Sequence, residues 1–237
     1  MADPAREAGI AGVVSDLVEA LRSGRELVDA LDLLVQACTE YTQAVEAAVI
    51  LRAEGDTYRA VASTAERTLD VEEAQIGVHG GPCIESIAHG TLFAVPDVRD
   101  VRDKWPDFVR SALSAGLGAA LALPLEVDGE TVGGVNVFLR EPGQLTEHEV
   151  SLVTSMLRVV GSGLSQRREN DAQAALADQL AFALDSRVVI EQAKGYLSYE
   201  RGTTVASAFS LLRSHARSHH LPLRDVAQDV VDRRLVL

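Results

Sequence analysis

Two apolar stretches joined by an Asp-Gly pair constrain the fold more than any other feature of the sequence. Residues 119–127 and 131–140 are rich in aliphatic side chains, and Asp128 and Gly129 stand between them. An Asp-Gly pair favours a tight type I′ turn because both of its residues tolerate a positive φ angle. The sequence therefore predicts a β-hairpin, and with it a fold that contains an antiparallel sheet.

Helices and further strands are predicted on both sides of this hairpin. Two helices begin with a capping box, in which a hydroxyl residue precedes a glutamate by three positions, at 63–66 and 146–149. Apolar periodicity and helix-start signals predict helices at 10–21, 26–41, 63–75, 105–116 and from 146 onward, strands at 44–53, 57–63 and 91–95, and a charged loop at 97–103. The order of these elements indicates an α+β fold around an antiparallel sheet.

The charge of the chain is unevenly distributed. The 237 residues carry a net charge of −13, and residues 1–171 contain 14 Lys and Arg against 28 Asp and Glu. Residues 172–237 contain 8 against 7 and are nearly neutral. Because affinity for a nucleic acid backbone depends on cations, this segment would need a local basic cluster, and we expect two copies in a dimer.

The sequence gives no indication of a membrane or secretory protein. It has no run of about 18 apolar residues, and its N-terminus lacks a basic start followed by an apolar core. Cys38 and Cys83 are too few for a disulfide framework and suit a reducing compartment, so we expect a cytoplasmic protein. Both thiols are expected to be packed small residues, with a redox-sensing Cys83 as the alternative.

A stripe of basic residues lies near the C-terminus. Arg187, Lys194 and Arg201 are seven residues apart, so on a helix they lie almost above one another, and Ser198 falls between the last two. Basic side chains at this interval suit repeated backbone phosphates. Gly195 costs about 1 kcal/mol within a helix, which indicates close approach by a backbone or a base of another molecule.

The stripe also has a plainer interpretation. Glu191 lies four residues after Arg187 and three before Lys194, so it can pair with both cations on a solvated helix face. Tyr196 and Tyr199 flank the stripe, and we expect one of them to pack while the other is free to stack on a base.

Two shorter helices are expected after Gly202. The first is capped by Thr203 or Thr204 and runs to about residue 218, and a break at 221–222 separates it from a third helix at 223–235. In the first of these helices the inward residues are expected to be Ala208, Leu211, Leu212 and His215 or Ala216, and the outward residues Ser210, Arg213 and Arg217.

Three segments in register resemble the ANTAR domain. The matching positions lie within 180–197, 208–216 and 223–227, and they include Ser186-Arg187, Ile190-Glu191-Gln192-Ala193-Lys194-Gly195, Ala208-Phe209 and Asp225-Val226-Ala227. Ser198, where the family usually has Met, and His219-His220, where an Asn is common, depart from the pattern. The resemblance implies a three-helix module that binds paired RNA stem-loops and controls transcription termination or translation. The RNA contacts that it implies are Arg187, Lys194, Gly195, Ser198, Arg201, Ser210 and Arg213.

The preceding part of the chain resembles a GAF domain. The resemblance rests on Gly81-Pro82-Cys83, the segment from Asp97 to Pro106, Leu123-Pro124-Leu125 and Gly133-Gly134-Val135-Asn136-Val137. It implies a central antiparallel sheet with helices on one side and a ligand cavity on the other. The cyclic-nucleotide signature of some GAF domains is missing, two cysteines are too few for an iron–sulfur cluster, and the histidines lie in loops and a capping turn. No cofactor is therefore identified, and the GAF ligand is unknown.

These observations predict an α+β GAF sensory domain at residues 10–166, a helical linker at 167–178, and an all-α three-helix ANTAR module at 179–237. The expected function is that of a signal-responsive regulator that binds RNA stem-loops as a homodimer, formed through the GAF domain and the linker helices, with a small-molecule ligand as a further GAF partner. The alternatives are a DNA-binding regulator with a helix-turn-helix, or a GAF sensor or scaffold that acts through protein partners. An enzyme is not expected, because no paired carboxylates, metal cluster, phosphate loop or catalytic triad stands out.

Overall fold

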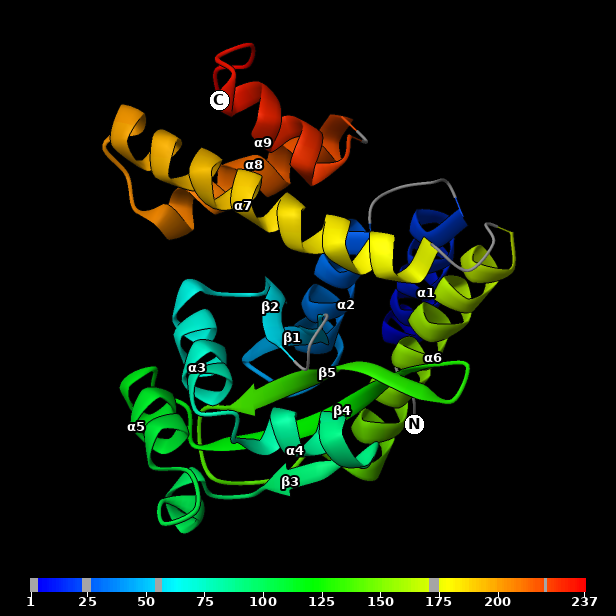
Figure 1. The fold of residues 1–237 in the computed structure, drawn as a ribbon, viewed down its shortest axis with the longest axis vertical. Coiled ribbons are helices and arrows are strands. Elements are labelled where there is room, and N and C mark those ends of the chain that lie inside the picture. The colour runs from blue at the N-terminus through cyan, green and yellow to red at the C-terminus, as the bar shows by residue number, and fades with distance from the viewer. Residues whose placement is uncertain (1–3, 23–26, 54–56, 171–174, 220) are drawn as a thin grey trace.

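A computed structural model describes residues 4–22, 27–53, 57–170, 175–219 and 221–237 (Figure 1). The side chains of residues 4, 5, 7, 167–170 and 175–185 are outside this description. The centre of the predicted linker, residues 171–174, also lies outside it. On either side of these residues, α6 (Glu147–Asn170) ends and α7 (Ala175–Arg201) begins.

The N-terminal part of the chain forms a five-stranded antiparallel sheet with the strand order β2-β1-β5-β4-β3. The strands are β1 (Glu46–Arg52), β2 (Tyr58–Ser63), β3 (Phe93–Val95), β4 (Ala119–Val127) and β5 (Glu130–Leu139). The predicted hairpin is confirmed, since β4 pairs with β5 and Asp128 and Gly129 have φ angles of 53° and 81°. These positive angles are those that a type I′ turn requires.

Helices cover both faces of the sheet. On one face, α2 (Leu27–Tyr41) and α6 pack against alternate residues such as Val49 and Leu121, and α1 (Pro4–Arg22) lies against both helices. On the other face lie α3 (Glu66–Gly77), α4 (Pro82–His89) and α5 (Pro106–Ser114), which cover residues such as Ile50 and Ala120. The expectation of helices on one side only was therefore wrong. Successive side chains of a strand point to opposite faces of the sheet, and in these strands both sets are apolar, so both faces need a cover of helices.

Several local predictions need correction. Helix α4 was missed, because Gly80-Gly81-Pro82 resembles a turn, whereas Pro82 occupies the first turn of an eight-residue helix. The loop at 97–103 contains a 3₁₀ helix, η2 (Val98–Val101). The capping box at 63–66 was also wrong: the Ser63 hydroxyl donates to the Ala65 carbonyl oxygen at 2.6 Å, and α3 begins at Glu66 without a side-chain cap.

The second capping box and the first break of the C-terminal module are confirmed. The Thr146 amide donates to Glu149 Oε2 at 2.9 Å, and the Glu149 amide donates to Thr146 Oγ1 at 3.3 Å. Helix α7 ends before Gly202, whose φ angle is 60°, and the Ser207 amide donates to Thr204 Oγ1 at 3.1 Å as α8 begins.

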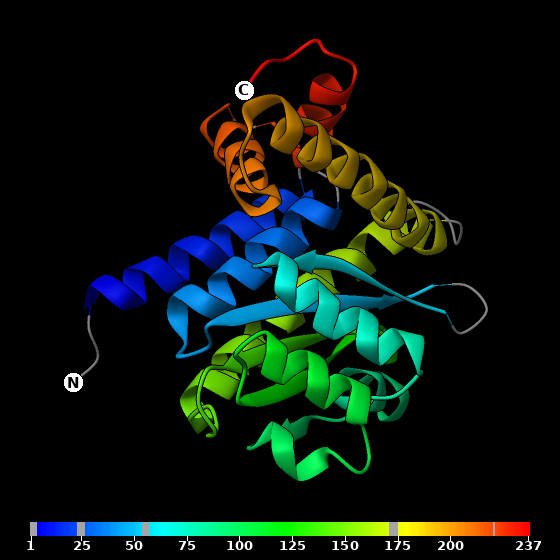
Figure 2. The same ribbon diagram turned by 90° about the vertical axis from the view of Figure 1, so that its left-hand side faces the viewer.

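The three C-terminal helices form a module that packs on the GAF-like part. Helices α8 (Val205–His219) and α9 (Leu223–Val231) pack on α7, and α7 contacts α2, β2 and α6 (Figures 1 and 2). The inner residues of the module include Ala193, Leu197 and Leu212, which join the same apolar cluster as the sheet and α2. Leu211 was expected to point inward, but it is 41% exposed.

Candidate nucleic-acid interface

Three basic side chains of the C-terminal module converge on the same side of the GAF-like part. Arg187 and Lys194 come from α7, two helical turns apart, and Arg213 comes from α8. We refer to Arg187, Lys194 and Arg213 as the basic cluster. Each of its members contacts residues of α2, β2 or α3, so the structure brings together three of the seven predicted contact residues at a boundary between the two domains.

Lys194 is the most deeply buried member of the basic cluster. Its side chain is 1% exposed, and its ammonium group pairs with Glu66 of α3 and with Glu191 Oε1 at 2.9 Å. The ammonium also lies 4.7 Å from the centre of the Phe209 ring, within the range of a cation–π contact. Lys194 therefore has its charge satisfied entirely within the chain.

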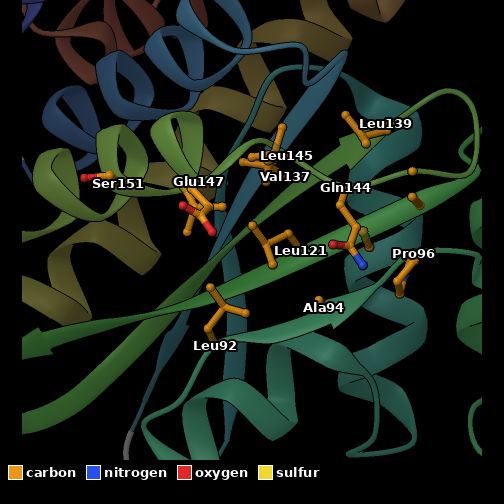
Figure 3. A pocket seen from close by; sticks show the side chains of 14 residues that line it. Leu92, Ala94, Pro96, Leu121, Val137, Leu139, Gln144, Leu145, Glu147 and Ser151 are labelled. Atoms are coloured by element: carbon orange, nitrogen blue, oxygen red, sulfur yellow. The ribbon is translucent and has the colours of Figure 1, made fainter.

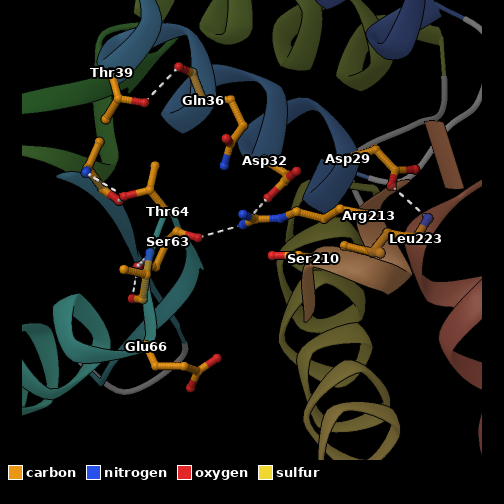
Figure 4. Close-up of polar contacts among 12 residues, drawn as sticks. Asp29, Asp32, Gln36, Thr39, Ser63, Thr64, Glu66, Ser210, Arg213 and Leu223 are labelled. Atoms are coloured by element: carbon orange, nitrogen blue, oxygen red, sulfur yellow. Dashed lines mark hydrogen bonds and ion pairs between the residues drawn. The ribbon is translucent and has the colours of Figure 1, made fainter. Parts of the chain in front are cut away.

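Arg213 was expected to point outward, but its side chain is only 10% exposed. Its Nη2 lies 2.6 Å from Asp32 Oδ1 of α2 and donates to the Ser63 carbonyl oxygen at 2.6 Å (Figure 4). The guanidinium also stacks 3.8 Å from the centre of the Phe209 ring. The prediction failed because the anionic partner lies about 180 positions away in the sequence, where helical periodicity carries no information.

Burial of the Asp32–Arg213 pair shifts the pKa values of both side chains. Burial raises the pKa of the Asp32 carboxyl above its usual value, and Arg213 and Arg217 oppose this shift only in part. Burial likewise lowers the pKa of the Arg213 guanidinium. Both pKa shifts indicate that this ion pair loses hydration when the domains pack together. The close contact between the two charges has to offset the free-energy cost of this desolvation.

Arg187 is half-buried and links α7 to the edge of the sheet. Its guanidinium donates to the carbonyl oxygen of Ala60 in β2, and it lies 3.6 Å from a Glu73 carboxylate oxygen of α3. A second carboxylate, that of Glu191, is 4.0 Å away. The pairing of Glu191 with Arg187 and Lys194 that helical spacing suggests is thus present, but residues of the GAF-like part add to it.

A further contact joins the domains beside the basic cluster. Asp29 of α2 accepts a hydrogen bond of 2.9 Å from the backbone amide of Leu223, the first residue of α9 (Figure 4). A carboxylate at this position interacts favourably with the unpaired amides and the dipole of a helix N-terminus. The N-cap residue of α9, Pro222, supplies no side-chain bond of its own.

The remaining predicted contact residues lie outside this boundary. Gly195, Arg201 and Ser210 are exposed, and the space where a Gly195 side chain would point contains no atom within 4 Å. Ser198 is half-buried, and its hydroxyl donates to the Thr203 carbonyl oxygen at 2.7 Å. Among the residues that the structure describes, none therefore makes the close approach that Gly195 permits.

The two tyrosines beside the stripe differ as expected. Tyr199 is 90% exposed, whereas Tyr196 is half-buried, with the Arg233 guanidinium 5.9 Å from its ring centre. Tyr199 thus presents a free aromatic face near Gly195. Such a face can stack on an unpaired base of any identity, because every base has a π-face.

Phe209 and the acidic partners of the basic cluster were not predicted from the sequence. Phe209 lies between two cations, and its position one residue after the inward Ala208 gave no signal of that role. Glu66 was assigned to a capping box, and Glu73 and Asp32 were not singled out. Only the excess of acidic residues in the first domain pointed towards such partners.

A buried polar cluster lies on the other side of α3, in the interior of the GAF-like part. Asn136 Nδ2 of β5 donates to both Glu72 carboxylate oxygens at 2.9 and 2.8 Å, and Gln75 Nε2 donates to Glu72 Oε2 at 2.8 Å. Gln75 Oε1 accepts the Cys83 amide at 3.0 Å. Burial raises the pKa of Glu72 to about 8, although Asn136 acts in the opposite direction.

Both thiols are buried, as expected for packed small residues. Burial raises the pKa of Cys38 to about 12, and burial together with Glu72 raises that of Cys83 well above its usual value. Neither environment favours a reactive thiolate. Among the described residues, no group of three or more His, Cys, Asp and Glu side chains could hold a metal ion.

An apolar pocket of about 370 Å³ lies between the β3 side of the sheet and the start of α6 (Figure 3). Its lining includes Leu121, Val137 and Leu145, and Gln144 and Glu147 supply polar groups at its margin. Its size is in the range of small-molecule sites. It lies on the α6 face of the sheet, away from the Glu72 cluster.

Two family models match the chain. The model described as GAF domain matches residues 24–165, and the model described as ANTAR domain matches residues 178–231. No curated protein matches the chain. No helix of the described residues is long and apolar enough to cross a membrane.

Solved structures resemble the first part of the chain. One is the GAF domain of a phosphoenolpyruvate-protein phosphotransferase from Acinetobacter, at 14% identity and a TM-score of 0.51, covering 69% of this chain and 96% of that one. Another is a domain of a two-component sensor histidine kinase protein from Sinorhizobium meliloti 1021, at 18% identity and a TM-score of 0.50, covering 62% and 96%. At these identities the likeness shows the fold alone.

Proposed function

The chain belongs to the GAF family and carries an ANTAR domain, and on this basis we propose that it binds paired stem-loops in nascent transcripts in response to a signal. An ANTAR domain is an RNA-binding antitermination module, and a GAF domain is a signal-sensing module. The bound RNA structure would then decide whether transcription terminates or whether the message is translated.

The observation that carries this proposal is the ANTAR match over α7–α9 together with the position of the basic residues. Arg187, Lys194 and Arg213 lie on the side of the module that faces the GAF domain, and Gly195, Tyr199 and Arg201 are exposed in the C-terminal part of α7. Cations suit the phosphates of a stem, and an exposed ring suits an unpaired loop base.

The proposal includes the state and place in which the protein acts. A module of almost zero net charge gains affinity when two copies bind two adjacent stem-loops, so we assign the active form to a homodimer. We place its action in the cytoplasm, in line with the reducing compartment that its two cysteines suit. We assign it no catalytic activity, and we assign signal recognition to the GAF domain.

Binding of the 237-residue chain to RNA tests this function. The probe is a library of RNAs with two adjacent stem-loops and randomised loop sequences, and the controls are single stem-loops and duplex DNA of equal length. We expect selective binding of the paired stem-loops. The logarithm of the association constant should fall linearly with the logarithm of the salt concentration. Preference for duplex DNA would instead favour a helix-turn-helix regulator.

A further inference from the structure

We propose that the GAF domain closes the RNA-binding face of its own chain with three carboxylates that occupy the basic cluster. This inference rests on the proposed function, because it concerns the regulation of the same site. The carboxylates belong to Asp32, Glu66 and Glu73, and we refer to them as the acidic clamp. RNA and the acidic clamp require the same side chains and therefore exclude each other.

Helix α3 presents its two carboxylates at the interval at which α7 presents its two cations. Glu66 pairs with Lys194, and Glu73 pairs with Arg187. Each pair of positions on one helix is seven residues apart, which is about 10 Å along a helix axis. The order is opposite in the two helices, so the pairs match when the helices run antiparallel. This agreement of spacing distinguishes the contact from an incidental surface ion pair.

Burial of the Lys194 ammonium makes the closed state incompatible with phosphate binding. With 1% of the side chain exposed, a phosphate can reach it only after Glu66 moves away. The closed state in turn depends on Glu66, because an ammonium group buried without a sufficient anionic partner is strongly destabilised. Glu66 itself keeps 33% of its side chain exposed, so it lies at the margin from which opening can begin.

Arg213 is closed by the third carboxylate in a similar way. Its Nη2 donates to Asp32 and to the Ser63 carbonyl oxygen, both at 2.6 Å, and Phe209 covers a face of the guanidinium plane. A guanidinium recognises phosphate through paired N–H donors. In the closed state Nη2 is engaged by Asp32 and Ser63, and Nε is buried without a hydrogen-bond partner, so neither is available to a phosphate. Asp32 thus takes the position that an RNA phosphate would need.

The charge of the GAF domain adds a longer-range barrier. The first 171 residues carry twice as many acidic as basic side chains, so an RNA backbone that approaches the closed interface meets a field of its own sign. When the ANTAR module separates from the GAF domain, the basic cluster becomes accessible and moves away from this field. Opening therefore increases RNA affinity in two ways.

Helix α3 connects the acidic clamp to the interior of the GAF domain. Glu66 and Glu73 face α7, whereas Glu72 and Gln75 on the same helix bond with Asn136 of β5 and with the Cys83 amide of α4. A change at the buried cluster that moves α3 would displace both carboxylates together. The fold thus provides a direct mechanical path from the sensory domain to the RNA-binding face.

The first test compares the affinity of two double variants for the paired stem-loop library. Glu66→Gln/Glu73→Gln removes two carboxylates of the acidic clamp and keeps side-chain shape. Glu40→Gln/Glu141→Gln makes the same change of net charge at two exposed residues of the GAF domain. We expect the first variant to bind RNA about 5- to 150-fold more tightly than the wild type, the usual range of coupling between two sites, and the second to change little.

The outcomes separate the two proposals. Equal tightening by both double variants, or RNA binding by the wild type as tight as that of Glu66→Gln/Glu73→Gln, would overturn the acidic clamp and leave RNA binding in place. No RNA binding by any of the proteins would overturn the proposed function, and the closing of an RNA face with it.

A second measurement tests the acidic clamp without RNA. Lys104 and Lys194 are the two lysines of the sequence, and their side chains are 51% and 1% exposed. In the wild type, an amine-acylating reagent should modify Lys104 rapidly and Lys194 slowly, as quantified by peptide mass spectrometry. Glu66→Gln/Glu73→Gln should accelerate acylation of Lys194 at least severalfold with Lys104 unchanged. An unchanged rate at Lys194 would contradict the acidic clamp.

Discussion

Arg213 of α8 and Asp32 of α2 form an ion pair across the domain boundary, with 2.6 Å between Nη2 and Oδ1. Because both side chains are largely buried, we expect Asp32→Ala to leave an unpaired guanidinium and to destabilise the chain by about 3–5 kcal/mol. Asp32→Leu/Arg213→Leu removes both charges, and we expect it to recover most of this loss. Chemical denaturation of the three proteins measures the effect, and equal stability of Asp32→Ala and wild type would contradict it.

The buried Glu72 makes stability depend on pH. Its pKa is raised from 4.5 to about 8, so the folded state holds a proton that the unfolded state releases between these values. The resulting stabilisation is complete below pH 4.5 and is lost as the pH rises to about 8. We expect the free energy of unfolding to fall over this window, and Glu72→Gln to remove most of the slope.

Urea denaturation between pH 5 and pH 9 measures this slope. Asp70 lies exposed on the same helix, so Asp70→Asn serves as the matched control and should keep the slope of the wild type. A Glu72→Gln variant with an undiminished slope would show that another group carries the pH dependence.

Gly195 separates helix stability from RNA contact. Its Cβ position is open, so Gly195→Ala should stabilise α7 by about 1 kcal/mol through its higher helix propensity. If RNA approaches the backbone here, the same methyl group should weaken RNA binding. Gly12 of α1 also has an open Cβ position, so Gly12→Ala should stabilise its helix and leave RNA binding unchanged. Unchanged RNA affinity in Gly195→Ala would remove Gly195 from the contact surface.

Local signals in the sequence were sufficient for much of the fold. The Asp128-Gly129 turn and the Thr146–Glu149 capping box depend on neighbouring residues alone, and both are confirmed. The Ser63–Glu66 pattern had the same local form, yet Ser63 bonds with Ala65 and Glu66 pairs with Lys194. A long-range ion pair competes here with a local cap, and the sequence contains no information on which is favoured.

The candidate interface could be predicted only in part for the same reason. The spacing of Arg187 and Lys194 placed them on one side of a helix, which the structure confirms. The packing of that side against α2, β2 and α3 could not be predicted, because Asp32, Glu66 and Glu73 lie more than 100 positions away. Arg213 was accordingly placed in solvent, although burial against Asp32 and Phe209 determines its position.

Lys194 pairs with Glu66 in the closed state and is also assigned to the RNA-binding face. Its effect on RNA binding is therefore measured most clearly after the acidic clamp is removed. The decisive measurement is the RNA affinity of Glu66→Gln/Glu73→Gln with and without Lys194→Ala, using the paired stem-loop library. We predict tight binding by the double variant and a loss of about tenfold or more in the triple variant, since a charge-assisted hydrogen bond contributes about 1.5–3 kcal/mol. Equal affinity of the two folded proteins would contradict the assignment of Lys194 to the RNA-binding face.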